Sequence, residues 1–439
     1  MAAADPPENS LYTRLPFFYG WVVVGVAFVT LAVAVNVRTS FSLLYPPILD
    51  EFGWSRGSTA AIFSAGFLAS VLFSPLVGAA MDRWGPRLVM PASTLLVAGG
   101  LALATLAGSP WLFSLTLGVM VVGCGIALAF IGHGALLPHW FRRRRGLAVG
   151  IAFAGAGLGA IVLLPWLQTV IDGRGWRAAC WAMVLLLVLL VLPLNAALQR
   201  RRPEDVGLNP DGRATENGNP GQAAEDSGVV DPVWAGTDWT LKLALRQPRF
   251  WWLLIGLFSA LYAWYAVSVH QTRYLLDIGF PEAQAAWALG FVWFLGIGGQ
   301  VGIGYLSDRL GREWAWSLAC LGFAACYLLL IVMETRPADW LLYLMVASQG
   351  LLGFGIAPMT ATISAELFQG RTFGRIFGLL SAGGTLGGAV GPWASGLFFD
   401  ATGSYAPAFW TACGFCGLST LAIWLAAPRK VRRVPGLDR

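Results

Sequence analysis

The chain is poor in charged residues. Asp, Glu, Lys and Arg make up 12% of its 439 residues, against about 25% in a typical soluble domain. Lysine occurs only at positions 242 and 430. Hydrophobic residues account for 57% of the chain, with 21 Trp and 26 Phe. This composition excludes an ordinary soluble protein and predicts that a lipid bilayer surrounds most of the chain.

The chain also lacks the motifs on which enzymes depend. It shows no metal-ligand cluster, no nucleophile–base pair and no phosphate-binding loop, so we expect neither enzymatic activity nor a bound metal or cofactor. All six cysteines fall within apolar stretches, which disfavours a disulfide framework. Cys413 and Cys416 form a C-x-x-C pair, and we interpret them as small packing residues rather than as a redox or metal site.

Long apolar stretches fill the rest of the chain. A membrane-spanning helix needs roughly 20 apolar residues to cross about 30 Å of hydrocarbon. Twelve stretches qualify, near residues 17–46, 57–80, 88–108, 110–136, 146–171, 177–199, 250–276, 283–306, 314–333, 339–365, 374–399 and 405–427. Residues 1–16 lack the basic region and cleavage site of a signal peptide, so we expect the first stretch to be retained. The pattern predicts an all-α membrane protein with twelve transmembrane helices.

Positive charge is distributed unevenly between the loops. With the N-terminus inside, 23 of the 29 Lys and Arg residues lie on the cytoplasmic side. Four lie on the other side (Arg56, Arg174, Arg177 and Arg336), and two lie within spans (Arg38 and Arg273). This bias predicts that both termini are cytoplasmic, in a multi-pass protein of the cell inner membrane. Nucleic-acid binding by the basic runs is the disfavoured alternative.

Residues 200–240 interrupt the apolar pattern. They are rich in Pro, Gly, Asp, Glu and Asn, a composition typical of a polar linker. We therefore predict an N-terminal six-helix bundle at residues 1–199 and a C-terminal six-helix bundle with a short basic tail at residues 241–439. The cytoplasmic linker at 200–240 would tether the two bundles as they move.

Two sets of residues repeat between these halves. One motif occurs twice, 226 residues apart, as Gly78-Ala-Ala-Met-Asp82-Arg83-Trp-Gly85-Pro-Arg87 and Gly304-Tyr-Leu-Ser-Asp308-Arg309-Leu-Gly311-Arg312. At an offset of 228, Gly150, Gly155 and Gly159 match Gly378, Gly383 and Gly387. A fixed period indicates a duplicated architecture, and small residues at this spacing let membrane helices approach closely. The two bundles are therefore predicted to be pseudo-symmetric.

The paired motif and the twelve spans resemble the major facilitator superfamily of transporters. The resemblance implies that the motif latches the two halves on the cytoplasmic side. The resemblance also implies that Asp82 meets the start of the eleventh span near Arg375 and that Asp308 meets the start of the fifth near Arg145. The physics is compatible, because an Asp at a helix end can face the positive N-terminus of a neighbouring helix. The implied latch residues are Asp82, Arg83, Arg87, Arg145, Asp308, Arg309, Arg312 and Arg375. In the alternative interpretation the arginines only set the topology.

A narrower resemblance is to the bacterial monocarboxylate transporter and oxalate/formate antiporter group. It is carried by Tyr19-Gly20-Trp21, by Glu51-Phe-Gly-Trp54-Ser-Arg56 and by Trp140-Phe-Arg-Arg-Arg-Arg-Gly146-Leu-Ala-Val-Gly150. It implies a small carboxylate substrate, moved with a proton or exchanged for another anion. The sequence departs from the animal members in the eighth span, where Gln300 and Gly296 occupy the positions of their Arg and Asp.

Few polar residues remain in the spans, and ionisable ones there indicate a functional site. Arg38 is the first choice for an anion ligand, because its guanidinium offers forked donors suited to a carboxylate. The alternative is an arginine that extends to the interface, an interpretation stronger for Arg273. The other candidate substrate ligands, each as compatible with bridging two helices, are Asn36, His133, Tyr262, Tyr265, His270, Gln271, Gln300 and Gln349.

Acidic residues are missing from the bilayer midplane, and Glu366 comes nearest to it. Only His133 and His270 could titrate there near neutral pH, so proton symport is allowed but not required. The leading hypothesis is a monomeric secondary active transporter that moves a small organic anion, such as lactate or pyruvate, by alternating access. The alternatives are an anion exchanger of the oxalate/formate type, an exporter of amphipathic or drug-like compounds, and a receptor with a transporter fold.

Overall fold

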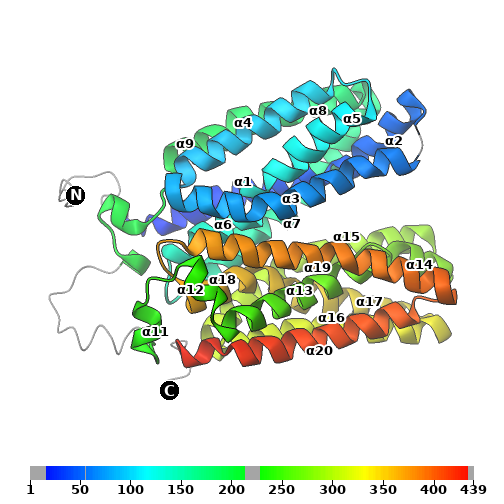
Figure 1. Ribbon diagram of the computed structural model, residues 1–439. Helices are drawn as coiled ribbons and strands as arrows, with labels where there is room; N and C mark the ends of the chain where they lie inside the picture. The colour runs from blue at the N-terminus through cyan, green and yellow to red at the C-terminus, as the bar shows by residue number, and fades with distance from the viewer. Residues whose placement is uncertain (1–15, 55, 213–227, 434–439) are drawn as a thin grey trace.

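The computed structural model describes residues 16–54, 56–212 and 228–433. Within these ranges the chain consists of helices and their connections, with one isolated β-bridge between Val229 and Arg432. Eleven of the described helical segments are long and apolar enough to cross a membrane. Figure 1 shows them as two bundles, one built from the first half of the chain and one from the second.

The N-terminal bundle contains six spans, and three of them are interrupted. Their bounds are α1 (Gly20–Thr39) with α2 (Phe41–Phe52); α3 (Arg56–Trp84); α4 (Pro86–Ala104); α5 (Pro110–Phe113) with η1 (Ser114–Gly123), η2 (Cys124–Ala127), α6 (Phe130–Leu136) and η3 (Leu137–His139); α7 (Arg145–Arg174); and α8 (Trp176–Leu186) with η4 (Leu187–Val191) and α9 (Leu192–Leu198).

The C-terminal bundle repeats this order. Its bounds are α13 (Pro248–Ser268) with α14 (Gln271–Asp277); α15 (Glu282–Leu310); α16 (Arg312–Thr335); α17 (Asp339–Ala347) with η7 (Ser348–Leu352), η8 (Gly353–Gly355) and α18 (Ile356–Phe368); α19 (Phe373–Thr402); and α20 (Ala406–Ala426) with η9 (Pro428–Lys430). The fourth span of each bundle passes through a π-helical and then a 3₁₀ segment, so the duplication extends to the irregular helices. The predicted pseudo-symmetric twelve-helix fold is confirmed.

The eleventh expected stretch forms α19, which is less apolar than the other spans and is not among those eleven segments. Its 30 residues include glycines where other spans carry large apolar side chains, and these lower its mean hydropathy. Its position identifies it instead, because α19 packs against both α13 and α3. The glycines of α19 have no side chain, so they let this helix pack closely against its neighbours.

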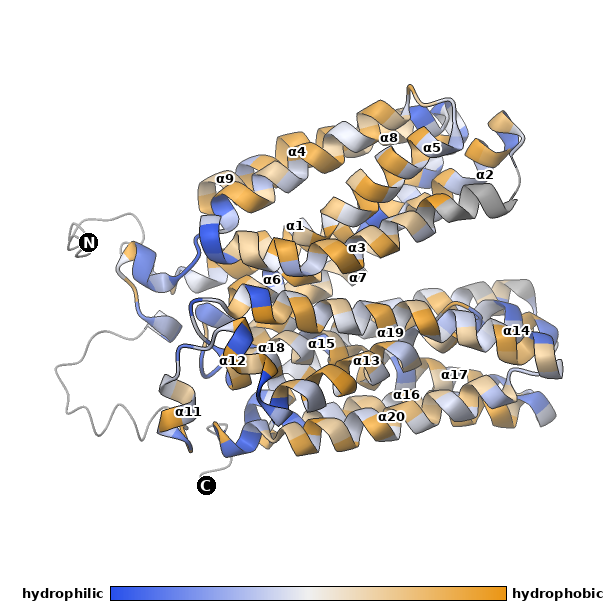
Figure 2. Cartoon of the chain, viewed as in Figure 1, coloured by the Kyte–Doolittle hydropathy of each residue, from blue (hydrophilic) through white to orange (hydrophobic). Residues whose placement is uncertain are grey.

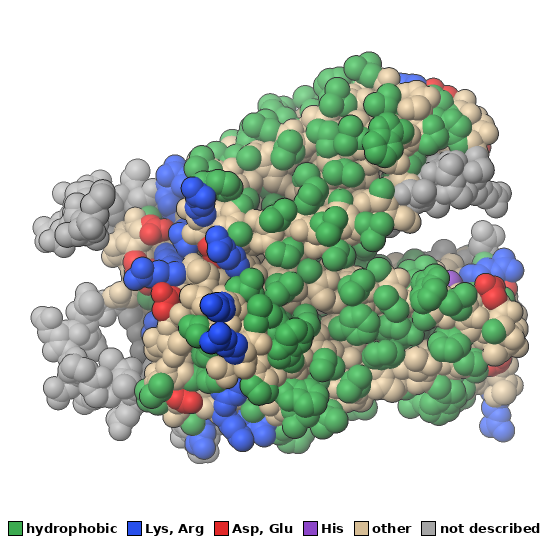
Figure 3. Space-filling model, in the orientation of Figure 1, with side chains coloured by type: hydrophobic (Ala, Val, Ile, Leu, Met, Phe, Trp, Pro, Cys, Tyr) green, Lys and Arg blue, Asp and Glu red, His purple; other side chains and the backbone are tan. Residues whose placement is uncertain are grey.

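The surface along the helices is apolar, as a bilayer requires. Leu72, Leu106 and Trp111 are among the large hydrophobic side chains that stay exposed. Figure 2 shows hydrophobic residues along the length of both bundles and hydrophilic residues at their ends. One end, the basic face, carries Arg142–Arg144, Arg200–Arg202 and Arg371, and Figure 3 shows Lys and Arg gathered there. The other end is called the opposite face.

The predicted linker is partly helical. Described parts of residues 200–240 form η5 (Pro203–Val206), η6 (Pro210–Gly212) and α11 (Pro232–Gly236), and α12 (Leu241–Leu245) follows; residues 213–227 lie outside the described part. The α11 segment is attached to the C-terminal bundle, since Trp234 Nε1 donates to the Leu367 carbonyl at 2.7 Å.

The repeated glycines make equivalent contacts only in part. Gly150 and Gly378 are equivalent, since each lies against a backbone carbonyl of the other bundle, that of Gln300 and that of Ser74. Further along, Gly155 lies against the Phe28 carbonyl, and it is Gly387, not Gly383, that lies against the Phe258 carbonyl. Since α7 and α19 begin and end at the predicted offset of 228, the repeat itself holds, and it is the packing of α13 on α19 that is displaced by about one helical turn.

Candidate functional site

Each copy of the repeated motif makes a one-residue turn between two long helices. Gly85 is the only residue between α3 and α4, and Gly311 is the only residue between α15 and α16. Their φ angles are 74° and 100°, a region that residues with a Cβ rarely adopt. Glycine is therefore required at both positions, and the turns hold Asp82 and Asp308 at the ends of their helices.

Asp82 caps a helix of the other bundle. Its two carboxylate oxygens accept hydrogen bonds from the backbone N–H groups of Gly374 and Arg375, both at 2.8 Å. These amides belong to the first turn of α19, where intrahelical partners are absent. The residue before α19, Thr372, provides no side-chain cap of its own. We call this arrangement the first cap.

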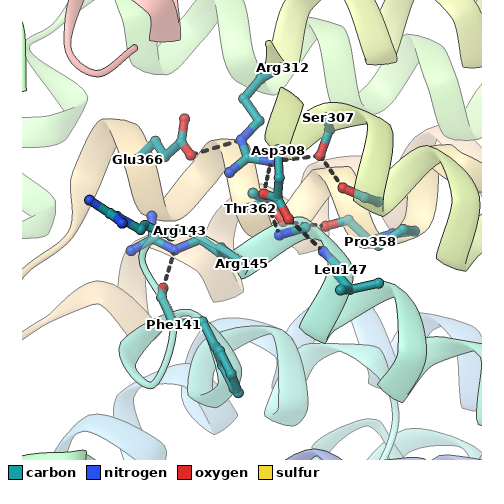
Figure 4. Close-up of polar contacts among 12 residues, drawn as sticks. Phe141, Arg143, Arg145, Leu147, Ser307, Asp308, Arg312, Pro358, Thr362 and Glu366 are labelled. Atoms are coloured by element: carbon teal, nitrogen blue, oxygen red, sulfur yellow. Dashed lines mark hydrogen bonds and ion pairs between the residues drawn. The ribbon is translucent and has the colours of Figure 1, made fainter. Parts of the chain in front are cut away.

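Asp308, in the C-terminal bundle, caps a helix of the N-terminal bundle. Its oxygens accept from the N–H groups of Gly146 at 2.9 Å and Leu147 at 2.8 Å, in the first turn of α7 (Figure 4). Here too the preceding residue, Arg144, provides no side-chain cap. We call this arrangement the second cap. Each bundle thus places one carboxylate on the positive end of a helix in the other.

Glycine makes these contacts possible. A Cβ on Gly78 would lie 1.9 Å from the Gly374 carbonyl oxygen, and one on Gly374 would lie 2.7 Å from Asp82 Oδ1. In the second cap, Gly304 and Gly146 bring their backbones together in the same way, with 2.4 Å between the built Cβ of Gly304 and the Gly146 carbonyl oxygen. The motif glycines therefore let α3 touch α19 and α15 touch α7 at the basic face.

The second cap extends into a buried network of charges. Arg312 donates through Nη1 to Asp308 at 2.7 Å and through Nε to Glu366 at 2.8 Å. The three side chains are between 3% and 7% exposed. A third bond, at 2.6 Å, joins Arg312 Nη1 to the Ser307 hydroxyl. A charged side chain is tolerated in a protein interior when it is paired with an opposite charge and hydrogen-bonded. These three side chains meet that condition.

Arg145 joins the two halves beside this network. Its guanidinium donates through Nε to the Phe141 carbonyl at 3.0 Å (Figure 4). Through Nη2 it donates to Gln369 Oε1, in the other bundle, at 3.1 Å. It also interacts electrostatically with Glu366. Arg145 does not bond to Asp308, which takes the backbone amides of the next two residues instead.

The first cap has no comparable network. Asp82 is half-buried, and no described Lys or Arg lies within ion-pair distance of it. Arg87 donates instead to the Ala196 carbonyl at 3.1 Å, at the end of α9 in its own bundle. The Arg375 side chain is exposed, and only its backbone takes part.

Two motif arginines stack on aromatic rings rather than joining the caps. Arg83 lies over the Trp84 ring at 5.4 Å, and Arg309 lies over the Tyr305 ring at 4.6 Å. Both are exposed on the basic face, where they fit the alternative of a topological anchor.

The structure adds cross-bundle contacts that the motif does not contain. Arg201 and Arg202 reach from the end of the N-terminal bundle to the carbonyls of Arg371 and Gly370, both at 3.4 Å. Burial lowers the pKa of Arg201, and the nearby Asp82 carboxylate opposes that shift. These arginines follow a basic run in the sequence, but nothing in that run indicates its partner.

Arg38 lies in the interior of the N-terminal bundle. Its Nε donates to the Val122 carbonyl at 2.9 Å and its Nη2 to the Ser70 hydroxyl at 3.1 Å. Val122 belongs to the π-helical segment η1, and Ser70 donates to the same carbonyl at 3.1 Å. The irregular fourth span and α3 therefore hold the guanidinium in place. No described carboxylate lies within ion-pair distance of it.

Tyr265 faces Arg38 from the other bundle. The two side chains are close enough to interact electrostatically, and both lie about 26 Å along their helices at 1.5 Å per residue from Gly20 and Pro248. Tyr265 is 36% exposed although it sits on an inner helix, and Arg38 is only half-buried. Figure 3 shows the two halves in contact at the basic face and separated by a gap toward the opposite face.

Three other candidate ligands hold helices of one bundle together. Asn36 donates to the carbonyls of Ala32 at 2.8 Å and Ala156 at 3.0 Å, which ties α1 to α7. His270 contacts the Pro392 carbonyl at 3.1 Å and the Tyr405 hydroxyl at 3.3 Å. Tyr262 is buried with its ring 4.0 Å from that of Phe415.

Four buried candidates keep a polar atom without a hydrogen-bond partner among the described residues. These atoms are His133 Nε2, Gln271 Oε1, Gln300 Oε1 and Gln349 Oε1. Gln271 donates to Met345 Sδ at 3.3 Å, and Gln349 makes a long contact of 3.5 Å to the Ser268 hydroxyl. Gln300 lies at the seam with α7, where its backbone carbonyl meets Gly150.

Arg273 lies apart from this group. It is at the opposite face on α14, 73% exposed, and forms an ion pair with Asp277 one turn along the same helix at 3.0 Å. Among the described residues no group of His, Cys, Asp and Glu could hold a metal ion. Of the two arginines predicted within spans, only Arg38 reaches the interior.

Glu366 and Gln369 take part in the contacts at the basic face, and the sequence did not predict either role. Glu366 was noted as the acid nearest the membrane interior but was not assigned to the latch, and Gln369 was not considered. Their only sequence signal is proximity to the start of the eleventh span.

Comparison with known proteins places the chain in context. It matches the family model described as Major Facilitator Superfamily over residues 26–356 and 303–438. It is 27% identical to monocarboxylate transporter 13 of Bos taurus over 415 residues, covering 94% of this chain and 88% of that protein. It is 29% identical to monocarboxylate transporter 11 of Mus musculus over 457 residues, covering 97% and 89%.

Solved structures show the same fold at low sequence identity. FucP in the outward conformation superposes with a TM-score of 0.68 at 15% identity, over 93% of this chain and 98% of that one. The proton:xylose symporter XylE, bound to 6-bromo-6-deoxy-D-glucose, gives 0.66 at 14% identity over 93% and 95%.

Proposed function

Because the chain belongs to the major facilitator superfamily and is a membrane transporter, not an enzyme, we propose that it moves a small organic anion by alternating access. A monocarboxylate such as lactate or pyruvate is the proposed substrate class. The names of the similar animal transporters support this class, and the interaction between Arg38 and Tyr265 of the other bundle gives it a chemical basis.

The observation that carries the proposal is the state of Arg38. Two of its five N–H donors are used by Val122 and Ser70, and no described carboxylate neutralises its charge. Arg38 is half-buried inside a membrane-spanning bundle, where a charge without a counter-ion is costly. A substrate carboxylate would supply the counter-ion and accept the remaining donors. Tyr265 faces the same space and would provide a hydroxyl from the other bundle.

The caps provide the proposed gate. In this arrangement both caps join the bundles at the basic face, and the gap between the bundles opens toward the opposite face (Figure 3). Arg38 and Tyr265 would border the inner end of that gap. We assign the basic face to the cytoplasm, since positive residues favour that side. Residues 1–199 and 241–439 would then rock as two bodies tethered by residues 200–240, and release of substrate inward would require both carboxylates to leave their helix ends.

Transport of the anion could be coupled to a proton or to exchange for a second anion, and the experiment below distinguishes the two. Among the described residues, the fully buried His133, with its free Nε2 atom, is the titratable group best placed inside the N-terminal bundle. An exchanger would need no such group. The two modes differ in whether an imposed proton gradient drives net uptake.

The test is uptake of labelled lactate, pyruvate, formate and oxalate into proteoliposomes, with and without an inward proton gradient. We expect uptake of at least one monocarboxylate. Arg38→Ala should lower uptake about thirtyfold or more, because truncating one partner of a desolvated charge pair typically has such an effect. Arg38→Lys should retain part of it, since the charge remains while the fork is lost.

Arg273→Ala is the matched control. It removes the other arginine predicted within a span, but that side chain is exposed and paired on its own helix, so uptake should stay within about twofold of the wild type. Absence of uptake of all four anions under either condition, in protein shown to be folded, would reject the carboxylate proposal. Equal losses in Arg38→Ala and Arg273→Ala would reject the assigned role of Arg38.

A further inference from the structure

A small pocket lies on the basic face, away from the gap between the bundles. It has a volume of about 120 Å³ and is formed by the turn around Gly311, the end of α20 and the segment that follows it. Since one water occupies about 30 Å³ in the liquid, the pocket has room for a group of a few heavy atoms. Its lining includes Trp314, Trp424, Arg429, Arg432 and Arg433.

The charges in this pocket are not balanced. Arg429 is paired with Glu313. The backbone N–H and the Nη1 atom of Arg429 both donate to Glu313 Oε1, at 2.8 Å and 3.4 Å. Arg432 and Arg433 have no carboxylate within ion-pair distance among the described residues. Arg432 Nε is buried without a hydrogen-bond partner in that part of the chain. Two positive charges therefore remain for a bound anion.

The backbone holds these two arginines in place. Val230 N–H donates to the Val431 carbonyl at 2.9 Å, and Arg433 N–H donates to the Gly228 carbonyl at 2.6 Å. The segment after α20 is thus paired with the end of the linker. Because the chain on either side of Arg432 is fixed, binding an anion would order little additional backbone, which favours affinity.

The surrounding tryptophans place the pocket at the edge of the bilayer. Trp314 is 62% exposed near the start of α16, and its ring lies 5.3 Å from that of Trp424 near the end of α20. Tryptophans at span ends mark the level of the lipid headgroups. Arg429 lies over the Trp424 ring at 4.6 Å, so the cationic side of the pocket is at that level too.

From these features we propose that the pocket formed by Trp314, Trp424, Arg429, Arg432 and Arg433 binds a phosphate-type anion, supplied by the headgroup of an anionic phospholipid. Basic pockets between helices on the cytoplasmic side are suited to such headgroups. The site adjoins the second cap, because Arg312 also lines the pocket and Arg432 interacts electrostatically with Glu366. The bound headgroup would offset repulsion among the arginines and stabilise the closed basic face.

The experiment measures the apparent affinity of the purified full chain for phosphatidylglycerol in detergent, from the lipid-dependent rise of the thermal unfolding midpoint. Phosphatidylcholine is the neutral-lipid control, and inorganic phosphate and glycerol phosphate test a soluble source. The double variant Arg432→Gln/Arg433→Gln should bind phosphatidylglycerol about thirtyfold more weakly, since each arginine near an anionic surface contributes roughly a factor of five.

The matched control removes two positive charges elsewhere on the same face. Lys242 and Arg246 lie on or directly after α12 and are exposed, so Lys242→Gln/Arg246→Gln should leave the affinity unchanged. Arg433→Gln alone changes an exposed side chain and serves if the double variant fails to fold, with an expected loss of about fivefold.

Unchanged affinity in Arg432→Gln/Arg433→Gln, or in Arg433→Gln if only that variant folds, would overturn the site. An equal loss in the Lys242→Gln/Arg246→Gln control would show a general surface effect and would also overturn it. If glycerol phosphate alone reproduces the stabilisation, the site stands but its lipid source is rejected.

Discussion

The two caps share one backbone geometry and differ in their side chains. The residues before α7 and α19 have nearly the same dihedral angles, φ −110° and ψ 31° at Arg144 against φ −108° and ψ 26° at Thr372. In each case one carboxylate accepts two amides of the first helical turn. Only the carboxylate of the second cap also binds a buried arginine.

A shift of one residue accounts for this difference. Arg312 is the first residue of α16, whereas Pro86 takes that position in α4 and Arg87 comes second. One residue turns a side chain by about 100° around a helix. Arg87 is thereby directed to the Ala196 carbonyl in its own bundle, while Arg312 reaches both Asp308 and Glu366. The duplicated backbone thus supports two caps of unequal strength.

The largest expected effect is that of Asp308→Asn. The amide would keep one acceptor oxygen, but its NH2 group would face either the Leu147 N–H or the N–H groups of Gly146 and Arg312, all of which are donors. Breaking a buried charge pair typically costs about 3–5 kcal/mol. We expect a marked fall in the thermal unfolding midpoint and loss of lactate uptake. A midpoint within one degree of the wild type would contradict the assigned network.

Asp82→Asn should have a smaller effect. It weakens two hydrogen bonds to backbone amides but leaves no buried arginine unpaired, so we expect a cost of about 1.5–3 kcal/mol. The same unfolding and uptake measurements give the comparison. If Asp82→Asn proves as destabilising as Asp308→Asn, the inequality of the caps is wrong.

Arg87→Ala should have the smallest effect of the three. The side chain is exposed and donates to one carbonyl, so its loss should cost about 1 kcal/mol or less. Arg312→Ala is the variant to compare with Arg87→Ala. It should lower the unfolding midpoint further, because it leaves the buried Asp308 and Glu366 carboxylates without the cation they share. Similar midpoints for these two variants would argue that the motif arginines act alike, contrary to the structure.

The sequence predicted the order of the spans well, because length and hydropathy decide which segments cross a bilayer. Which helix starts Asp82 and Asp308 meet was implied by the resemblance to the major facilitator superfamily, because the repeated motif is specific to it. The sequence predicted that each carboxylate would face a helix N-terminus, but not which groups there would bind it; these are backbone amides rather than the side chains of Arg145 or Arg375. Hydrogen-bond direction at a helix start depends on packing that composition does not encode.

The candidate substrate ligands were harder to assign from the sequence. Asn36 and Arg38 lie two residues apart, yet Asn36 ties two helices of one bundle together and Arg38 interacts with Tyr265 of the other bundle. Two residues separate side chains by about 200° around a helix, and hydropathy cannot say which side faces the other bundle. Glu366 was missed because its partner, Arg312, lies on another helix 54 residues away in sequence.

The most direct test of the account is whether an anion bound at Arg38 shifts the equilibrium between the two faces. Spin labels at Glu204→Cys and Lys242→Cys report on the basic face, and labels at Arg174→Cys and Arg336→Cys report on the opposite face, with the six native cysteines replaced. Electron–electron distance measurements with and without lactate should show the basic-face distance lengthen and the opposite-face distance shorten. In Arg38→Ala neither distance should respond. The account would be contradicted if lactate left the distances between the spin labels unchanged in the wild type, or if it changed them equally in Arg38→Ala.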